Sequence, residues 1–210
     1  MIGEHEQAVE AYREALTVYK DIVGEDHPSF ATTLHNLGLL FKSMADISSG
    51  LEKQVMLDRA AENLELALQT RKTVLDNDNP DIANSMQSLA TVYRQMTGTA
   101  QNAERAKSLL KESVELLRRS VGSEHTATAT ALNNLGLLHK VQGSFDEALQ
   151  AYQEAFDVRK RLLSEEHPDT ITVMHNMAEL YDAMSEESKA QLLRNQILDL
   201  LDPAGEQSRE

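Results

Sequence analysis

Cysteine and tryptophan are absent from this chain of 210 residues, and proline, glycine and aromatic residues are few. Without cysteine there is no disulfide, no thiolate metal site and no cysteine nucleophile. Four prolines and nine glycines argue against a loop-rich or low-complexity protein. No apolar run approaches the length of about 18 residues that spans a membrane, and the acidic first residues resemble neither a signal peptide nor a transit peptide. We therefore expect a cytoplasmic protein that is not inserted into a membrane.

Basic residues are also in short supply, with 20 lysines and arginines against 34 aspartates and glutamates. The formal net charge is −14, and the calculated isoelectric point is about 4.9. A surface of this charge repels the phosphates of nucleic acids and anionic lipids, so neither is an expected partner. The 41% of hydrophobic residues are enough for the core of one or two domains.

The sequence contains internal repeats. Four segments align without gaps, beginning at His27, Asn79, His125 and His167. A second segment type precedes each of them and carries small residues twelve and nineteen positions upstream. These are Ala15, Ala67, Ser113 and Ala155, and Ala8, Ala60, Ala106 and Ala148. The repeat is 42 residues long, with one insertion within 43–57 and another within 96–102. Residues 43–50 either form a loop or lengthen two helices.

Each repeat unit is predicted to be a pair of helices. In the first helix, apolar or small residues recur at i, i+3, i+4 and i+7, as in Leu34, Leu37, Gly38 and Phe41. Prolines at 28, 80 and 168 suit the first turn, and Asn79 is expected to cap its helix better than the histidines do. The prediction is an all-α, right-handed α-α superhelix of about nine helices in antiparallel pairs. It covers residues 1–201 as one continuous solenoid, followed by a flexible tail at 202–210.

Three motifs resemble those of a known family. They are Leu132-Asn133-Asn134-Leu135-Gly136-Leu137-Leu138, the block from Gly143 through Glu147-Ala148-Leu149 to Tyr152, and Glu166-His167-Pro168. They resemble tetratricopeptide repeats, and the 42-residue spacing with its His-Pro junction resembles the kinesin light chain subtype. This resemblance implies a scaffold that binds a peptide or protein. It does not make the chain a motor subunit, because the heptad segment of a light chain is not present.

The first helix of the array is expected to lack a partner. Gly3 aligns with Gly143, so the chain is predicted to begin with the second helix of a pair. An apolar face containing Ala8, Tyr12 and Ala15 would then be uncovered. Either the sequence is a fragment, or another chain covers this face, including a second copy by self-association.

No residue pattern indicates catalysis. The histidines at 27, 125 and 167 occupy equivalent junctions one repeat apart, so they are expected to be structural and not to converge on a metal. There is no glycine-rich phosphate loop and no Gly-x-Ser-x-Gly. We predict a non-enzymatic protein without cofactor or metal site. A metal-dependent hydrolase that uses clustered histidines and acids is the less favoured alternative.

The candidate site is the concave groove that the first helices are expected to line. Polar residues repeat there, and amides both donate and accept hydrogen bonds, as a peptide backbone requires. The predicted peptide-binding residues are His35, Asn36, Asn84, Ser88, Asn133, Asn134, His175 and Asn176, with a basic row of Lys42, Arg94 and Lys140. By resemblance to the light-chain Leu-Asn-Asn-Leu pattern, Asn36, Asn134 and Asn176 would contact the peptide.

The basic row suggests that the ligand carries acidic residues. Two other readings remain open. These polar residues could simply face solvent, with the cations compensating helix dipoles. The array could also regulate a larger enzyme or signalling protein instead of binding cargo.

Overall fold

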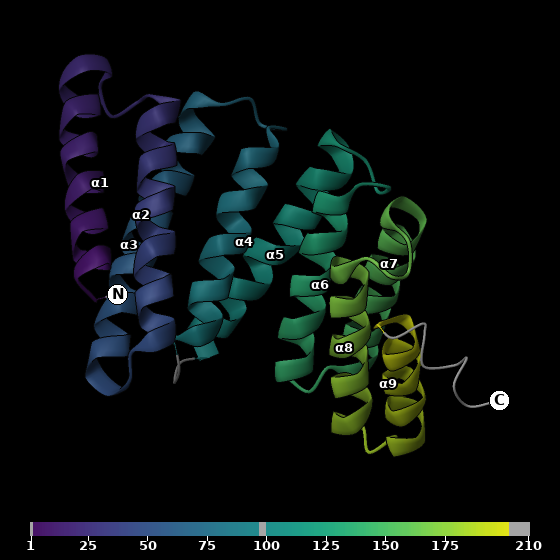
Figure 1. Ribbon diagram of the computed structural model, residues 1–210. Coiled ribbons are helices and arrows are strands. Elements are labelled where there is room, and N and C mark those ends of the chain that lie inside the picture. Colours follow the sequence, from purple (N-terminus) through teal and green to yellow (C-terminus); the bar gives the residue numbers. More distant parts are fainter. Residues whose placement is uncertain (1, 97–99, 202–210) are drawn as a thin grey trace. The chain divides into compact units, whose positions relative to one another are not determined.

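The computed structural model describes residues 2–96 and 100–201, which form nine α-helices and no β-strand (Figure 1). This confirms the predicted all-α fold. The predicted tail at 202–210 lies outside the described residues. The helices are α1 (Ile2–Val23), α2 (Pro28–Ile47), α3 (Gly50–Val74), α4 (Pro80–Gln95), α5 (Ala100–Ser120), α6 (Thr126–Val141), α7 (Phe145–Leu163), α8 (Pro168–Ala183) and α9 (Glu187–Leu201).

The chain divides into two compact units, which we call unit 1 (Met1–Leu116) and unit 2 (Leu117–Glu210). In unit 1, α2 packs against α1 and α3, and α3 packs against α4. In unit 2, α6, α7, α8 and α9 pack in chain order (Figure 1). We call α2, α4, α6 and α8 the first helices, and the others the second helices. The single continuous solenoid over residues 1–201 stays a prediction.

Each first helix begins with a side-chain cap. All three junction histidines act as caps, because the imidazole Nδ1 of each accepts a backbone hydrogen bond at 3.1 Å, slightly longer than the 2.9 Å bond that Asn79 accepts. This satisfies an amide that otherwise has no partner in the first turn. The caps and the amides that they accept from are His27 and Ser29, Asn79 and Asp81, His125 and Ala127, and His167 and Asp169. The junction histidines therefore have a structural role.

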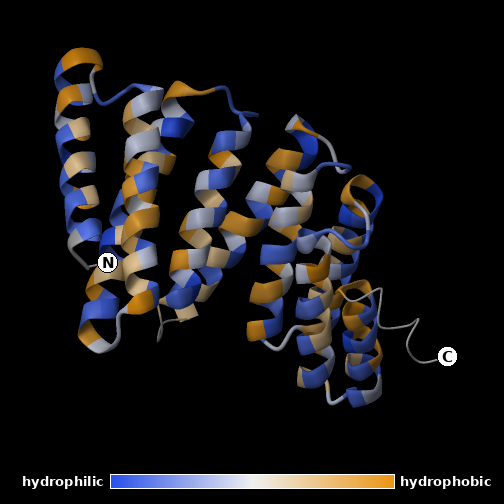
Figure 2. Ribbon diagram, viewed as in Figure 1, coloured by the Kyte–Doolittle hydropathy of each residue, from blue (hydrophilic) through white to orange (hydrophobic). Residues whose placement is uncertain are grey.

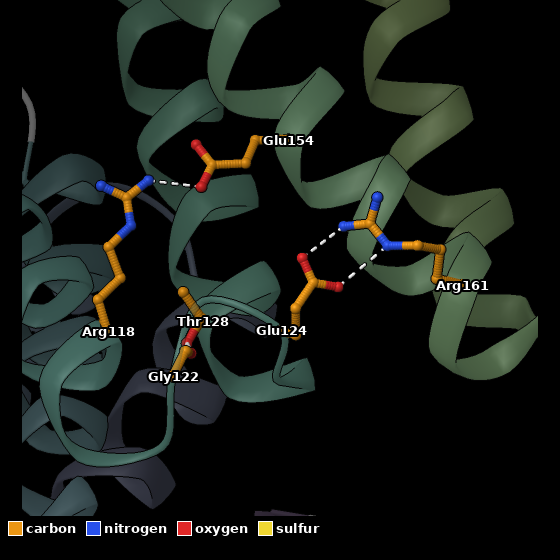
Figure 3. A network of polar contacts seen from close by, with 6 residues as sticks. All are labelled: Arg118, Gly122, Glu124, Thr128, Glu154 and Arg161. Carbon is orange, nitrogen blue, oxygen red and sulfur yellow. Dashed lines mark hydrogen bonds and ion pairs between the residues drawn. The ribbon is translucent and has the colours of Figure 1, made fainter.

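Three second helices, α1, α5 and α7, end in backbone turns with positive φ, whereas α3 is followed by Leu75 with φ of −109°. Gly24 after α1 has φ of +86°, and Gly122 after α5 has +94°, a conformation that glycine adopts without strain. After α7 the same place is taken by Ser164, with φ of 90°. The Thr170 hydroxyl donates to the Ser164 carbonyl at 2.8 Å, and Thr128 does the same to Gly122 at 2.7 Å (Figure 3). A threonine in the next first helix thus secures each of these two turns.

The first insertion lengthens two helices and does not form a loop. Helix α2 continues to Ile47 and α3 begins at Gly50, so Ser48 and Ser49 alone connect them. The first helix α2 has 20 residues, against 16 in each of α4, α6 and α8. The second helix α3 has 25 residues, against 21 in α5 and 19 in α7. The second insertion falls partly on residues 97–99, which are outside the described part of the chain.

Close contacts between first and second helices explain the small residues of the repeat. A Cβ placed on Gly38 would lie 2.6 Å from Leu64 Cγ, and a Cβ on Gly136 would lie 2.7 Å from Tyr152 Cδ1. Leu64 and Tyr152 are both fully buried. The alanines on the second helices at 60, 67, 148 and 155 are fully buried as well. Hydrophilic and hydrophobic residues are interspersed along the helices of both units (Figure 2).

Candidate peptide-binding faces

The predicted binding residues lie on first helices in both units, where α2 contacts α4 and α6 contacts α8. We call the residues of α2 and α4 the unit-1 polar face, which consists of His35, Asn36, Lys42, Asn84, Ser88 and Arg94. Those of α6 and α8 form the unit-2 polar face, which consists of Asn133, Asn134, Lys140, His175 and Asn176. Asn84 and His175 are exposed, His35 is buried, and the others are half-buried.

On the unit-2 polar face, two of the predicted asparagines bind each other. The Asn176 amide nitrogen donates to the Asn133 amide oxygen at 2.8 Å, linking α8 to α6. This bond fixes both side chains in orientation. It leaves the Asn133 amide nitrogen as a donor and the Asn176 amide oxygen as an acceptor. Asn133 and Asn176 come from consecutive repeats, and the sequence pattern alone placed them on the same face.

On the unit-1 polar face, His35 lies below the surface. Its side chain is 4% exposed, and its Nδ1 is 3.4 Å from the Ser85 hydroxyl oxygen of α4. Burial, and secondarily the charge of the nearby Arg71, lowers the pKa of His35 to about 4. The imidazole is therefore neutral at physiological pH. His175, which shares its repeat position, is exposed on α8.

Sequence reasoning missed two buried arginines below these faces. Arg71 of α3 is 4% exposed. Its Nη1 donates to the Asp81 carbonyl at 2.9 Å and to the Ser85 hydroxyl at 2.8 Å, and its Nη2 lies 3.4 Å from the Thr32 hydroxyl. One side chain of a second helix thus bridges the two neighbouring first helices, α2 and α4. Burial lowers the pKa of Arg71, although the guanidinium remains charged.

Arg159 of α7 makes the equivalent bridge in unit 2. It is 6% exposed, and its Nη1 donates to the Asp169 carbonyl of α8 at 2.6 Å while its Nη2 donates to the Thr130 hydroxyl of α6 at 3.0 Å. Its buried Nε has no hydrogen-bond partner among the described residues. The repeat pattern contained one signal for these buried arginines. Arg71 and Arg159 share their repeat position with Tyr19 and Leu117, and an arginine at an otherwise apolar position suggests a buried charge.

Two of the three cations in the predicted basic row already have acidic partners. Lys42 is 2.6 Å from the Asp46 carboxylate, one turn further along α2. Lys140 of α6 is 2.6 Å from Glu179 of α8. Arg94 has no ion pair or hydrogen bond with the side chains that the structure describes, and it is half-buried on α4. The basic row is therefore uneven, with Arg94 as its unpaired member.

The second helices of unit 2 carry a separate polar surface. Arg118 at the end of α5 pairs with Glu154 of α7 at 2.5 Å, and Arg161 of α7 makes two bonds to Glu124 at 2.6 and 3.0 Å (Figure 3). Exposed pairs of this kind contribute little to stability individually. They border an open cavity of about 620 Å³ that is also lined by Asp146. Of the four carboxylates that line the cavity, Glu124 and Glu154 belong to these ion pairs, and Asp146 and Asp157 do not.

The described residues contain no group of three histidine, aspartate or glutamate side chains arranged to hold a metal ion. Within the same ranges, no helix combines the length and the apolar character needed to cross a membrane.

Comparison with known protein families identifies the class of protein. Two models of the tetratricopeptide repeat match the chain, one over residues 129–202 and the other over residues 2–29. Together with the succession of helix pairs, these matches show that the chain contains tetratricopeptide repeats. The resemblance seen in the sequence is confirmed.

Among proteins of known sequence, the chain is similar to Protein KINESIN LIGHT CHAIN-RELATED 1 of Arabidopsis thaliana, with 26% identity over 151 residues. This match covers 71% of the chain and 22% of the relative. The RxLR effector protein SFI4 of Phytophthora infestans is 24% identical over 152 residues, which cover 72% of the chain and 41% of the effector. The chain thus spans less than half the length of these relatives.

Several solved structures have folds similar to that of this chain. BtubC (BKLC) from P. vanneervenii has a TM-score of 0.79 at 22% identity, covering 97% of this chain and 75% of that chain. The nearly identical TPR-like repeats of a Podosopora anserina protein, assigned as a kinesin light chain, give a TM-score of 0.75 at 21% identity. That match covers 99% of this chain and 90% of the other. At these identities the likeness concerns the fold.

Proposed function

We propose that this protein is a non-enzymatic interaction module that binds an extended segment of a partner protein along its first helices. Tetratricopeptide repeats typically serve as protein-interaction scaffolds. The observation that carries the proposal is the bond between Asn133 and Asn176 on the unit-2 polar face. It holds one amide donor and one amide acceptor in fixed orientation on adjacent first helices.

This pair matches the chemistry of a peptide backbone. An extended peptide presents N–H and C=O groups that must replace their bonds to water when the peptide is bound. Asn133 offers a donor and Asn176 an acceptor, and neither has to break the bond between them. Because that bond already restricts both side chains, less conformational entropy is lost on binding. Asn36, Asn84 and Ser88 would make similar contacts on the unit-1 polar face, and Asn134 and His175 would add to those of unit 2.

The ligand segment is expected to carry acidic residues. Lys42, Arg94 and Lys140 lie on the polar faces of a protein whose net charge is −14. Arg94 should contribute most, because Lys42 and Lys140 would have to exchange Asp46 and Glu179 for the ligand. An exposed pair of this kind is worth about 0.2–1 kcal/mol and weakens as salt rises.

The test is a selection of binders from a random 12-residue peptide library displayed against the full chain. Selected peptides are then titrated by calorimetry against the wild-type protein and against the Asn133→Ala, Asn176→Ala double variant. We expect the double variant to bind at least about tenfold more weakly, since two hydrogen bonds are lost.

The matched control for this test is Gln191→Ala, Asn195→Ala on α9. Gln191 donates to Asn195 at 2.8 Å, so this pair is also an amide–amide bond, but it is exposed and lies on a second helix. The control should bind like wild type. Equal affinities for all three proteins, or the absence of any selected peptide, would overturn the proposed binding face.

A second candidate is a regulatory array within a longer polypeptide. It is favoured by the coverage of the curated relatives, of which the chain spans 22% and 41%. Mapping both ends of the transcript tests this second candidate. A catalytic domain in the same reading frame would support a regulatory role of the repeats toward that domain. A transcript without such a domain would leave the interaction module as the function.

A further inference from the structure

On the unit-2 polar face, the charge that solvent meets is a carboxylate and not a lysine. Lys140 of α6 and Glu179 of α8 are 2.6 Å apart, but the Lys140 side chain is 15% exposed and the Glu179 side chain is 60% exposed. Glu179 accepts the Lys140 hydrogen bond through Oε2, and its Oε1 accepts no hydrogen bond from the described residues. The ion pair thus turns its negative end toward solvent, with one acceptor oxygen still available.

The next charges along α8 and α9 are paired with each other. Asp182 lies one turn after Glu179 on α8, and each of its carboxylate oxygens accepts a hydrogen bond from one Nη of Arg194 on α9. The charge of Arg194 also acts on Glu179, but both Nη atoms of Arg194 donate to Asp182. Glu179 is therefore the carboxylate of this face that can accept a further cationic donor.

Leu137 gives this carboxylate an apolar neighbour on α6. It lies one turn after Asn133 and one turn before Lys140, so it stands between the two side chains of α6 that bind α8. Leu137 is half-buried, which leaves part of its side chain for a ligand to cover. Lysine and arginine combine an aliphatic stem that can cover a leucine with a cationic end that a carboxylate accepts.

Unit 1 has the same apolar position with the opposite charge beside it. Leu39 of α2 is 38% exposed at the repeat position of Leu137, and the equivalent of Glu179 on α4 is the neutral Thr91. One turn after Thr91 stands Arg94, which has no ion pair or hydrogen bond with the side chains that the structure describes. The two polar faces therefore suit ligand residues of opposite sign.

We propose that the unit-2 polar face selects a lysine or arginine of the bound segment, with its stem on Leu137 and its charged end on Glu179. This inference rests on the function proposed above, because the bonded pair of Asn133 and Asn176 must hold the backbone of the same segment. A basic ligand residue leaves the ion pair with Lys140 intact. An acidic one would have to displace Glu179 and would leave a carboxylate without its cation. The acidic residues of a ligand thus belong to the unit-1 polar face.

The test uses the 12-residue peptides selected against the full chain, restricted to those that the Asn133→Ala, Asn176→Ala double variant binds at least about tenfold more weakly. We expect each of these peptides to contain a lysine or arginine whose replacement by glutamine weakens binding to the wild-type protein about two- to fivefold, as for one partly exposed ion pair. Replacement by glutamate should weaken it further. With the Glu179→Gln variant, the basic peptide and its glutamine version should bind equally.

Glu112→Gln is the matched control protein. The Glu112 side chain is 50% exposed and lies 3.0 Å from the Lys72 ammonium, so it is also a carboxylate bound to a lysine of another helix. Both of these residues lie on second helices, away from the polar faces. The control changes the net charge by the same amount as Glu179→Gln, and it should keep the full preference for the basic peptide.

The outcomes distinguish this inference from the proposed function. Peptides that depend on the asparagine pair but contain no such basic residue would overturn the selection by Glu179 and leave the binding face in place. An equal loss on replacing the basic residue in the wild type and in Glu179→Gln would do the same. If no selected peptide depends on the asparagine pair, the binding face and this inference fail together.

Discussion

Arg71 in unit 1 and Arg159 in unit 2 occupy the same repeat position, but they reach different numbers of acceptors. Both bridge two first helices through a backbone carbonyl and a threonine hydroxyl. Arg71 also donates to the Ser85 hydroxyl, whereas the equivalent residue in unit 2 is Val173. A single difference between the repeats thus changes how well a buried cation is paired. Because an unpaired buried polar group is costly, the bridge in unit 2 should contribute less than the bridge in unit 1.

A second difference concerns the position of His35. In unit 1 this position is a buried imidazole between α2 and α4, next to Ser85 and near Arg71. In unit 2 the same position on α6 is Asn133, which binds Asn176 and remains half-buried. Unit 1 therefore places a titratable group below its polar face, and unit 2 places an amide in its polar face.

The largest expected loss of stability comes from replacing the glycines that allow first and second helices to pack closely. Gly136→Ala should cost about 3 kcal/mol, because the new Cβ meets three atoms of the fully buried Tyr152 ring within 3.1 Å. Gly38→Ala should cost about 2 kcal/mol, because the branched end of Leu64 can rotate away more easily than a ring. Urea unfolding measures both. Since alanine stabilises an unconstrained helix by about 1 kcal/mol, a gain in stability for either variant would contradict this packing.

The next effect is a pH dependence that unit 1 should have and unit 2 should lack. Above pH 6.5, His35 is neutral in both the folded and the unfolded chain. Between pH 6.5 and about 4, His35 is protonated in the unfolded chain but not in the folded chain. The free energy of unfolding therefore decreases as the pH is lowered through this range. The loss by pH 4 should be roughly 2–3 kcal/mol.

Urea unfolding at pH 7, 5.5 and 4.5 measures this loss in the wild type and in His35→Asn. The variant carries the residue that unit 2 has at the same position, so its free energy of unfolding should depend less on pH. An identical pH dependence in the two proteins would show that other groups cause it.

The arginine bridges should differ in strength by about 1 kcal/mol. Arg71→Met leaves the Asp81 carbonyl and the hydroxyls of Ser85 and Thr32 without their donor, so we expect a loss of about 2–3 kcal/mol. Arg159→Met leaves only the Asp169 carbonyl and the Thr130 hydroxyl, and it also removes an unpaired buried Nε. Its cost should be about 1–2 kcal/mol. Thermal unfolding of the two variants checks the order, and a larger loss for Arg159→Met would reverse the comparison.

The sequence predicts the fold well because the repeat constrains it at many positions. The small residues, the prolines and the caps recur from unit to unit. A wrong alignment of the repeats would therefore misplace several of them at once. The asparagines were predicted for the same reason, since Asn133 and Asn176 follow the spacing of the first helix. Their mutual bond was not predictable, because it depends on the distance between α6 and α8 and not on the position within a helix.

The buried charges were missed for a different reason. Arginine near the end of a helix usually faces solvent and compensates the helix dipole, and the sequence does not show which arginine instead passes between two helices. His35 was predicted to line the groove because its equivalents Gln87, Asn133 and His175 are polar. The neighbours that bury it, Ser85 and Arg71, belong to other helices. Tertiary contacts of this kind leave little trace in a single sequence.

The smallest expected effect tests whether the missing hydroxyl explains the difference between the bridges. Val173→Thr adds to unit 2 the kind of group that Ser85 supplies in unit 1, at the same repeat position and within a similar volume. A buried threonine normally destabilises, because its hydroxyl loses water without gaining a full partner. Here Arg159 can donate to it, so we expect a change of less than about 0.5 kcal/mol.

Val92→Thr is the matched control for this substitution. Val92 lies on first helix α4 and is as completely buried as Val173, but no hydrogen bond of an arginine is described beside it. Its replacement should cost about 1–2 kcal/mol. The prediction is thus a difference of about 1 kcal/mol between two chemically identical substitutions, measured by urea unfolding at pH 7. If both variants lose the same free energy of unfolding, Arg159 does not donate to the added hydroxyl. The difference in strength between the two arginine bridges would then have a cause other than Ser85.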